Sequence, residues 1–458
     1  MKRKMTEGRI FLNLLAFSLP LVIGSLFQLT YNLFDYIILG WFSKNPIESQ
    51  AAIGVAGPIM NIFISLFSGL CVGAGIHSSE LYGNKDIKNL KRQFSSFLLV
   101  FGIISLSIAL VFALCLDPIL TISNVTDPFL KSEAEIYLAI VSAGFIFTFI
   151  YNLYASILRS MGDSFASLLF LILSCVLNIA LNVLFVVVLN LEVLGVALST
   201  LISQILSAFS IMIYGIIKYP EVLKFKIEEY VIDYSLLKIS SSYAIASALQ
   251  QIVLYLGKYL ISIRINRYDA IVIDAFSAAS KIDDFVFTPA QNFAHAAAIF
   301  IAQNKGAKQY QRAKKGFFVG FGLNLIYGTL ITTVILLTKE TLLNVFISND
   351  ISISATKALV IENGVKYLSV MCLLYLLPCV TNSIQSYFRG VGKLNIVFLS
   401  TTVQIIFRVA FVYILIYLTS NPLPSSALAC GFGWIAMILF ELPLLIHYYK
   451  TNKNLIIE

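Results

Sequence analysis

Long apolar stretches that are nearly free of charge alternate with short polar segments along the whole chain. Runs such as Phe94 to Leu116, Phe165 to Leu189 and Phe317 to Leu337 reach the roughly 20 residues that a helix needs to cross a hydrocarbon layer about 30 Å thick. Shorter runs would indicate the buried helices of a soluble protein. The pattern therefore predicts an all-α membrane protein that crosses a lipid bilayer many times.

Hydropathy predicts twelve transmembrane helices. Their approximate bounds are 12–40, 51–77, 94–116, 134–157, 165–189, 194–217, 240–263, 270–300, 316–338, 359–387, 394–418 and 426–447. With 59% hydrophobic and 12% charged residues among 458, the chain carries more apolar material than one soluble core requires. The apolar stretch behind the basic N-terminal head is too long for a signal core, so the first helix is expected to remain.

The basic residues gather before the first span, after every second span and at the C-terminus. The richest of these segments are 82–93 and 303–315. Because Lys and Arg accumulate on the cytoplasmic side, both termini are predicted to lie in the cytoplasm of a cell-membrane protein. The net charge of +8 is thereby explained without nucleic acid. No obligate protein partner is evident, and the six cysteines form no metal or disulfide pattern.

Several motifs recur in the same order in the two halves. The pairs are Ser25/Ser247 and Gln28/Gln250 at an offset of 222, Gly83/Gly306 at 223, and Arg159/Arg389 with Gly162/Gly392 at 230. An offset of six helices returns the chain to the same membrane side, so the halves have parallel topology. The repeat predicts two pseudo-symmetric six-helix lobes, 1–225 and 226–458, that rock about a central cleft, as in alternating-access transporters.

These motifs resemble those of the multidrug and toxic compound extrusion (MATE) family over essentially the whole chain. The residues that carry the resemblance are PLVIGSLFQLTYNLFDYIILG from Pro20, AAIGVAGPI from Ala51, ILRSMGD from Ile157, ALQQ from Ala248, AQNKGA from Ala302 and YFRGVGK from Tyr387. The resemblance implies antiport, in which inward flow of Na+ or H+ drives the export of amphipathic, usually cationic, organic compounds. No cofactor is implied beyond that coupling cation.

Asp35 is the first candidate for the coupling site. It lies in the apolar first span, where a carboxylate costs roughly 2.5 to 3.5 kcal/mol on insertion scales and usually serves a function. In the family resembled, the aspartate at this position binds or exchanges the coupling cation. The alternative is a structural hydrogen-bond acceptor for Tyr31 or Asn32.

Asn178 and Asn182 share one face of the fifth span because they are four residues apart. With Asp35 and Thr200 they match the sodium site of several bacterial MATE proteins, which makes these four residues a candidate Na+ site. Asn182 departs from that site, where relatives carry aspartate, but it keeps a carbonyl ligand for a hard cation. The alternative is a set of interhelical hydrogen bonds.

Charged residues in the second half supply candidates for substrate binding. Lys281 and Asp284 are close enough to pair along one helix, and Asp283 lies beside them. Because this helix lines the cleft in relatives, the carboxylates are candidates to hold a cationic substrate or a proton; a structural ion pair is the alternative. Lys258 is expected to extend to the membrane interface.

Arg408 lies within the eleventh predicted span. It is expected to bond helix-end carbonyls or a carboxylate such as Glu362 or Glu441, among which the sequence does not choose.

Aromatic side chains suit a greasy cleft that stacks on flat cations. The candidates are Tyr31, Phe34, Tyr151, Tyr154 and Phe285. The alternative for each is packing against lipid or other helices, which most rings in such a protein do.

Three other functions fit the sequence less well. A flippase for lipid-linked oligosaccharide or peptidoglycan precursors shares the two-lobe architecture, but such proteins usually have more helices and a more basic cleft. A membrane enzyme would need clustered nucleophile, histidine or metal-ligand residues, and an ATP-driven pump would need a phosphate-binding loop. Neither pattern is present in the sequence, so the prediction is a secondary exporter that is not an enzyme.

Overall fold

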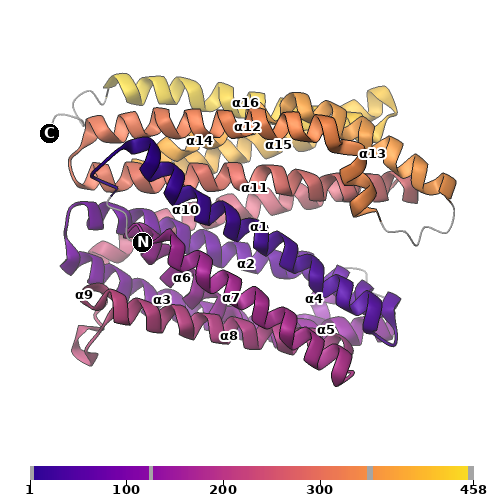
Figure 1. Ribbon diagram of the computed structural model, residues 1–458, viewed down its shortest axis with the longest axis horizontal. Coiled ribbons are helices and arrows are strands. Elements are labelled where there is room, and N and C mark those ends of the chain that lie inside the picture. Colours follow the sequence, from indigo (N-terminus) through magenta and orange to yellow (C-terminus); the bar gives the residue numbers. More distant parts are fainter. Residues whose placement is uncertain (1–4, 123–126, 348–353, 452–458) are drawn as a thin grey trace. The chain divides into compact units, whose positions relative to one another are not determined.

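The computed structural model describes residues 5–122, 127–347 and 354–451, and these ranges are helical throughout, without strands (Figure 1). The helices are α1 (Ile10–Phe42), α2 (Pro46–Gly83), α3 (Ile87–Leu114), α4 (Leu116–Ile122), α5 (Pro128–Ala143), α6 (Phe145–Ser160), α7 (Ser164–Asn182), α8 (Glu192–Lys218), α9 (Pro220–Leu223), α10 (Tyr234–Ile265), α11 (Ala270–Gly306), α12 (Tyr310–Phe346), α13 (Ser354–Leu374), α14 (Leu376–Gly390), α15 (Leu394–Thr419) and α16 (Pro422–Thr451). A π-helical segment, Val183–Val188, follows α7, and a 3-10 turn, Ile227–Glu229, precedes α10.

Among the described residues, ten helices are long and apolar enough to cross a membrane. Two further spans are bent pairs, α5 with α6 at 44° and α13 with α14 at 46°, which bring the candidate spans to twelve. The predicted all-α fold with many transmembrane helices is confirmed, and each predicted span falls on one helix or one bent pair.

The two bends have local causes. Pro378 stands in the first turn of α14 and lacks the N–H that would bond the carbonyl of Leu374, so the helix breaks between the two. At the other bend Gly144 separates α5 from α6. A Cβ at Gly144 would lie 2.1 Å from the Gln204 side chain, so only glycine fits there without a shift.

The chain packs into two compact units. The first comprises Leu19–Ala248, and the second comprises Met5–Ser18 together with the chain from Leu249 onward. The first turns of α1 therefore pack with the second unit, and the first half of α10 packs with the first unit. Pro20, inside α1, lies two residues beyond the point where α1 passes from one unit to the other.

The first unit contains aromatic packing of α2, α3 and α6. Phe63 stacks on Phe145 at 5.3 Å between ring centroids, and Phe97 stacks on Phe101 at 4.2 Å. On its other flank α2 touches α10 backbone to backbone: a Cβ at Gly73 would lie 2.3 Å from the carbonyl oxygen of Tyr243. Such close approach is how small residues join helices in membranes.

In the second unit α11 packs on α12 and α14, and α15 packs on α16. Gly433 allows the closest approach of α16 to α15, since a Cβ there would lie 2.8 Å from the carbonyl oxygen of Gln404. Phe287 packs edge-on against both Tyr375 and Trp434, at 5.8 and 5.5 Å between centroids. These contacts hold a group of charged side chains described below.

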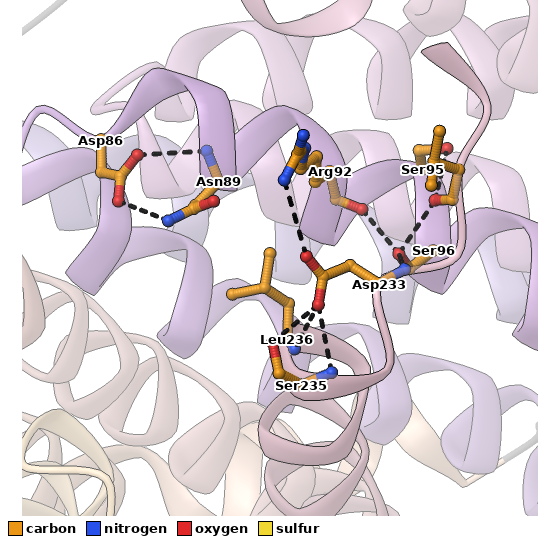
Figure 2. Close-up of polar contacts among 9 residues, drawn as sticks. Asp86, Asn89, Arg92, Ser95, Ser96, Asp233, Ser235 and Leu236 are labelled. Atoms are coloured by element: carbon orange, nitrogen blue, oxygen red, sulfur yellow. Dashed lines mark hydrogen bonds and ion pairs between the residues drawn. The ribbon is translucent and has the colours of Figure 1, made fainter. Parts of the chain in front are cut away.

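The segment that leads into α10 is fastened to α3 (Figure 2). The backbone N–H of Asp233 donates to the Ser96 hydroxyl at 2.8 Å, and the Asp233 carboxylate lies 3.9 Å from Arg92. The same carboxylate accepts from the backbone N–H groups of Ser235 and Leu236, so it caps the first turn of α10.

A second set of contacts holds the same segment a few residues earlier. Lys91 on α3 forms an ion pair with Glu229 at 2.8 Å. Phe225 stacks on Phe94 at 5.8 Å and packs on Tyr230 at 5.0 Å. This docking explains why α10 starts as a continuation of the first unit.

The segment that leads into α1 is held in a comparable way within the second unit. The Arg312 guanidinium donates to the backbone carbonyls of Met5, Glu7 and Gly8 at 2.7 to 3.2 Å, and Asn304 also donates to Met5. The fastening residues of both segments come from the two sequence-related basic regions, 82–93 and 303–315, or lie within a few residues of them.

Candidate functional site

The structure brings Asp35, Asn178, Asn182 and Thr200 together inside the first unit. Asn182 Nδ2 donates to Asp35 Oδ1 at 2.6 Å and to Asn178 Oδ1 at 2.9 Å, and Asn178 Nδ2 donates to Thr200 Oγ1 at 3.3 Å. All four side chains are buried, with at most 6% of their surface exposed. Three helices, α1, α7 and α8, thus converge on one polar chain inside an apolar unit.

Local structure explains why the two asparagines face the aspartate. Asn178 and Asn182 are one turn apart on α7, and α7 ends at Asn182. The backbone then continues as the π-helical segment Val183–Val188. Such segments often occur at functional sites, because the extra residue shifts the register of side chains beyond it. The sequence contains no signal for this change of helix type.

One acceptor in the site is left over. The Oδ1 atom of Asn182 is buried and has no hydrogen-bond partner among the described residues. Together with Asp35, Asn178 Oδ1 and Thr200 Oγ1, it adds to a set of oxygens, the ligand type that hard cations prefer. Asp35 is the single carboxylate of this set, and no group of three or more His, Cys, Asp or Glu is found in the described parts of the chain. The residues present fit one monovalent cation or one proton.

Asp283 in the second unit is held by two tyrosines. Tyr367 and Tyr375 donate to its two carboxylate oxygens, each at 2.7 Å. Sequence reasoning did not identify these tyrosines, which come from α13 and the junction behind it. With both oxygens already accepting, Asp283 is a well-anchored buried carboxylate.

Asp284 pairs with a different lysine from the one expected. Lys258 Nζ lies 2.5 Å from Asp284 Oδ1, and both side chains are partly exposed. Lys281 has no ion pair or hydrogen bond within the described ranges, so the expected pairing of Lys281 with Asp284 is wrong. Lys258 reaches Asp284 from a separate helix, α10, and the spacing of residues along α11 does not reveal a partner from another helix. Lys258 therefore ends in an ion pair.

The aromatic candidates fall into different environments. Tyr151 donates to the carbonyl oxygen of Ser167, and Tyr154 is buried edge-on against Phe94. Phe285 packs on Phe346, and Phe34 is 38% exposed. The side chain of Tyr31 lies outside the described residues. The contacts of Tyr151 and Tyr154 favour the packing alternative for these two.

The repeat relates the Asp35 site to a second location. Helix bounds agree with an offset of 230: α6 ends at Ser160 and α14 at Gly390, while α8 begins at Glu192 and α16 at Pro422. By the same offset Asn178 corresponds to Arg408 and Thr200 to Cys430.

Arg408 behaves as the counterpart of Asn178 in its contacts. Just as Asn178 bonds Thr200, the Arg408 guanidinium lies beside the Cys430 thiol, with Tyr367 and Asp283 nearby. The offset alone, extended along the chain, would have revealed this equivalence.

The two carboxylates named as examples of partners for Arg408 are wrong. Glu362 pairs with Lys366 at 2.8 Å, and Glu441 lies near Arg389 instead. The carboxylate in the neighbourhood of Arg408 is Asp283. Glu362 and Lys366 are one turn apart on the same helix, which makes their pairing local, whereas helix packing decides the environment of Arg408.

The profile of the MatE family matches residues 20–184 and 246–414, one stretch in each half of the chain. The chain belongs to the MatE family. Its two matched stretches agree with the internal repeat. As a MatE protein it is a multi-pass membrane transporter and not an enzyme.

Known MatE relatives are similar over most of their length. The probable multidrug resistance protein YoeA of Bacillus subtilis strain 168 is 24% identical over 355 residues, 76% of each chain. The FAD transporter of Shewanella oneidensis strain MR-1 is 25% identical over 333 residues, 71% of each chain. A crystal structure of a MATE protein in complex with MaL6 has a TM-score of 0.89 at 19% identity, covering 98% of each chain. At that identity the likeness of structure concerns the fold.

Proposed function

We propose that this MatE protein is a secondary antiporter that exports amphipathic, mainly cationic, organic compounds in exchange for Na+ or H+. The observation that carries the proposal is the buried chain from Asp35 through Asn182 and Asn178 to Thr200, with the unpartnered oxygen of Asn182. A buried carboxylate is costly unless a cation or a hydrogen-bond donor compensates it. Exchange of the compensating cation therefore has a direct energetic effect on this unit.

Asn182 supplies the means of exchange. In the arrangement described, its amide N–H compensates the ionised Asp35. A half-turn of the amide would direct Asn182 Oδ1 to the same place, next to Asp35 Oδ1 and Asn178 Oδ1, where it can bind a cation or accept from protonated Asp35. Binding and release of the cation then change the contact between α7 and α1. Alternating access requires such a difference between the cation-bound and cation-free states.

The direction of transport rests on topology and on relatives. The distribution of basic residues supports cytoplasmic termini, so that Na+ or H+ enters while the organic compound leaves. The name of YoeA supports export of drug-like compounds. The name of the Shewanella relative, an FAD transporter, makes an anionic dinucleotide the second substrate to test, and the unpaired Lys281 gives that test a structural motive.

The experiment measures efflux of a fluorescent organic cation, and separately of FAD, from proteoliposomes under imposed Na+ or proton gradients. Wild type is compared with Asp35→Asn and with Glu362→Gln, a control that removes a carboxylate paired locally with Lys366. We expect one gradient to drive efflux in wild type and in the control, and Asp35→Asn to lose it. Normal transport by Asp35→Asn, or transport that no gradient drives, contradicts the proposal. Movement of lipid-linked sugars in place of organic cations would support the alternative function, a flippase for lipid-linked precursors.

A further inference from the structure

A second buried polar network lies within the second unit and shares no hydrogen bond with Asp283. Its members come from α10, α14, α15 and α16, and each is at most 6% exposed. They are Gln250, Gln385, Arg389, Ser400, Thr401 and Glu441. Two of them, Arg389 and Glu441, are ionisable residues inside an apolar protein.

The side-chain N–H and O–H groups of the neutral members already donate hydrogen bonds to other residues. Gln250 Nε2 donates to Gln385 Oε1 at 3.2 Å and to Thr401 Oγ1 at 3.0 Å. Gln385 Nε2 donates to Ser400 Oγ at 3.3 Å and to Thr401 Oγ1 at 3.1 Å. The hydroxyl of Ser400 donates to the carbonyl oxygen of Val397 at 3.0 Å.

Glu441 has no surface exposed to solvent, and neither of its carboxyl oxygens has a hydrogen-bond partner in the described parts of the chain. Its polar neighbours are Ser400 and Gln385, whose hydrogen bonds in this arrangement run to Val397 and to Ser400 and Thr401. The Glu441 carboxyl group is therefore buried without a donor. Burial without compensation disfavours a carboxylate more than a neutral carboxylic acid, which carries its own O–H.

Arg389 carries the charge opposite to that of Glu441 and lies in the same network, but the two form no ion pair. Arg389 Nη2 donates to Gln250 Oε1 at 2.9 Å and to Gln385 Oε1 at 3.4 Å. Its Nη1 has no partner among the described residues, and no ion pair joins it to Glu441, although the charge of Arg389 acts on Glu441. A donor without acceptor and a carboxyl without donor thus lie in one buried network.

The first unit repeats only part of this network. Arg389 and Gln250 have the counterparts Arg159 and Gln28, but at the offset of 230 Gln385 corresponds to Ala155, Thr401 to Leu171 and Glu441 to Ile211. Ala155 and Ile211 are buried apolar residues. The same helices therefore pack without a carboxyl group at this position, and Glu441 is specific to the second unit.

We propose that Glu441 is a proton-binding site of the second unit, with Arg389 as its built-in counter-charge. In the protonated form, the Glu441 O–H donates to Ser400 Oγ. When the O–H bond breaks, the proton passes to water, the electron pair stays on the carboxylate, and Arg389 Nη1 donates to it. That movement of Arg389 loosens its bond to Gln250 on α10. The ligand is a proton and not Na+, since Arg389 repels a metal cation at this position.

Several other charged groups on the helices that pack against α16 have partners of their own, whereas Lys281 on α11 has none among the described residues. Asp283 on α11 is held by tyrosines, Glu362 and Lys366 on α13 pair with each other, and Arg408 on α15 lies at Cys430. Arg389 on α14 is the titratable group that faces Glu441. A change in the protonation of Glu441 therefore acts mainly on Arg389.

The test uses infrared difference spectra of the full-length protein in nanodiscs, recorded between alkaline and acidic pH. All variants carry Asp35→Asn, so that the outcome does not depend on the Asp35 proposal. We expect a carbonyl band of a protonated carboxylic acid that is lost in Glu441→Gln, retained in Glu441→Asp and in Glu362→Gln, and unaffected by Na+. In Arg389→Gln the band should persist to higher pH, because the counter-charge that favours ionisation is gone.

A purely structural Glu441 would leave the band unchanged on titration. The proposal is overturned if Glu441→Gln retains the full pH-dependent band, or if Na+ at constant pH abolishes it in the parent protein. Size-exclusion profiles identify variants that fail to fold. Should Glu441→Gln be among them, the shifted band of Glu441→Asp and the pH shift in Arg389→Gln decide the question.

Discussion

Arg408 on α15 stands in the second unit where Asn178 stands in the first. Asn178 bonds Thr200 at 3.3 Å, and Arg408 lies beside Cys430, the residue that corresponds to Thr200 at the offset of 230. The guanidinium is a permanent, tethered positive charge near the Asp283 carboxylate. Where we propose a site for an exchangeable cation in the first unit, the second unit carries a covalently attached cation.

Arg408→Asn should convert this tethered charge into a cation requirement. Without the guanidinium, the buried Asp283 loses a nearby positive charge that favours its ionised form, so the second unit should become less stable. We expect a lower thermal unfolding temperature in choline buffer that Na+ or K+ partly restores. Arg408→Lys, which keeps the charge, should show no such rescue; equal salt dependence in both variants would contradict the equivalence.

Asn182→Asp should increase the affinity of the Asp35 site for cations. The amide N–H that compensates Asp35 disappears, and a second negative charge within the site attracts a cation more strongly. We expect apparent cation affinity in transport assays to rise at least about tenfold, equivalent to ~1.4 kcal/mol. Asn182→Leu, which removes both the donor and the oxygen, serves as the opposite control and should abolish coupling.

Asp163 predicts a pH dependence of stability. It caps α7 and accepts hydrogen bonds from Tyr219, Tyr214 and Lys218. Burial opposes ionisation, but these hydrogen bonds and the charge of Lys218 outweigh it and lower the pKa of Asp163 below its ordinary value. The stabilisation is therefore present above the unfolded-state pKa, about 3.9, and is lost as pH falls through the folded-state pKa.

Asp163→Asn should reduce the free energy of unfolding by on the order of 3 kcal/mol at neutral pH, because several hydrogen bonds lose their charge. Thermal unfolding of both proteins is measured from neutral to acidic pH. The difference should shrink as pH falls below about 4, because Asp163 of the unfolded chain then takes up a proton and Asp163 of the folded protein does so only at its lower pKa. A difference that stays constant across this range would show that the Asp163 charge contributes nothing.

The fastening of the segment before α10 can be tested by proteolysis. Hydrogen bonds from the Ser235 hydroxyl and the Leu236 N–H lower the pKa of Asp233, and the hydrogen bond from Lys91 lowers that of Glu229. Both carboxylates thus act in ionised form, and their contribution is present at neutral pH and lost on acidification.

Asp233→Ala removes the cap of α10, typically a loss of about 1 kcal/mol, and the ion pair to Arg92. We expect faster tryptic cleavage at Lys224 and Lys226, followed by mass spectrometry of the fragments. Glu228→Gln, a substitution of an exposed residue in the 3-10 turn of the same segment, is the matched control and should be cleaved like wild type. Equal cleavage of Asp233→Ala would mean that the segment is held elsewhere.

Much of the fold follows from the sequence, because lipid imposes a strong and local rule. A span must be about 20 apolar residues of helix, so runs such as Phe94 to Leu116 predict spans without knowledge of their neighbours. The repeat relating Arg159 to Arg389 is equally readable from the chain. The i, i+4 spacing of Asn178 and Asn182 also required nothing beyond helix geometry.

Partner choice between helices was decided by tertiary structure. Lys258 rather than Lys281 pairs with Asp284, Tyr367 and Tyr375 hold Asp283, and Asn182 is followed by a π-helical segment. Hydrophobic burial is non-directional, so apolar patterning predicts that a helix is in the membrane but not which polar side chains meet inside it. Those meetings depend on helix rotation and crossing, and only the packed structure determines both.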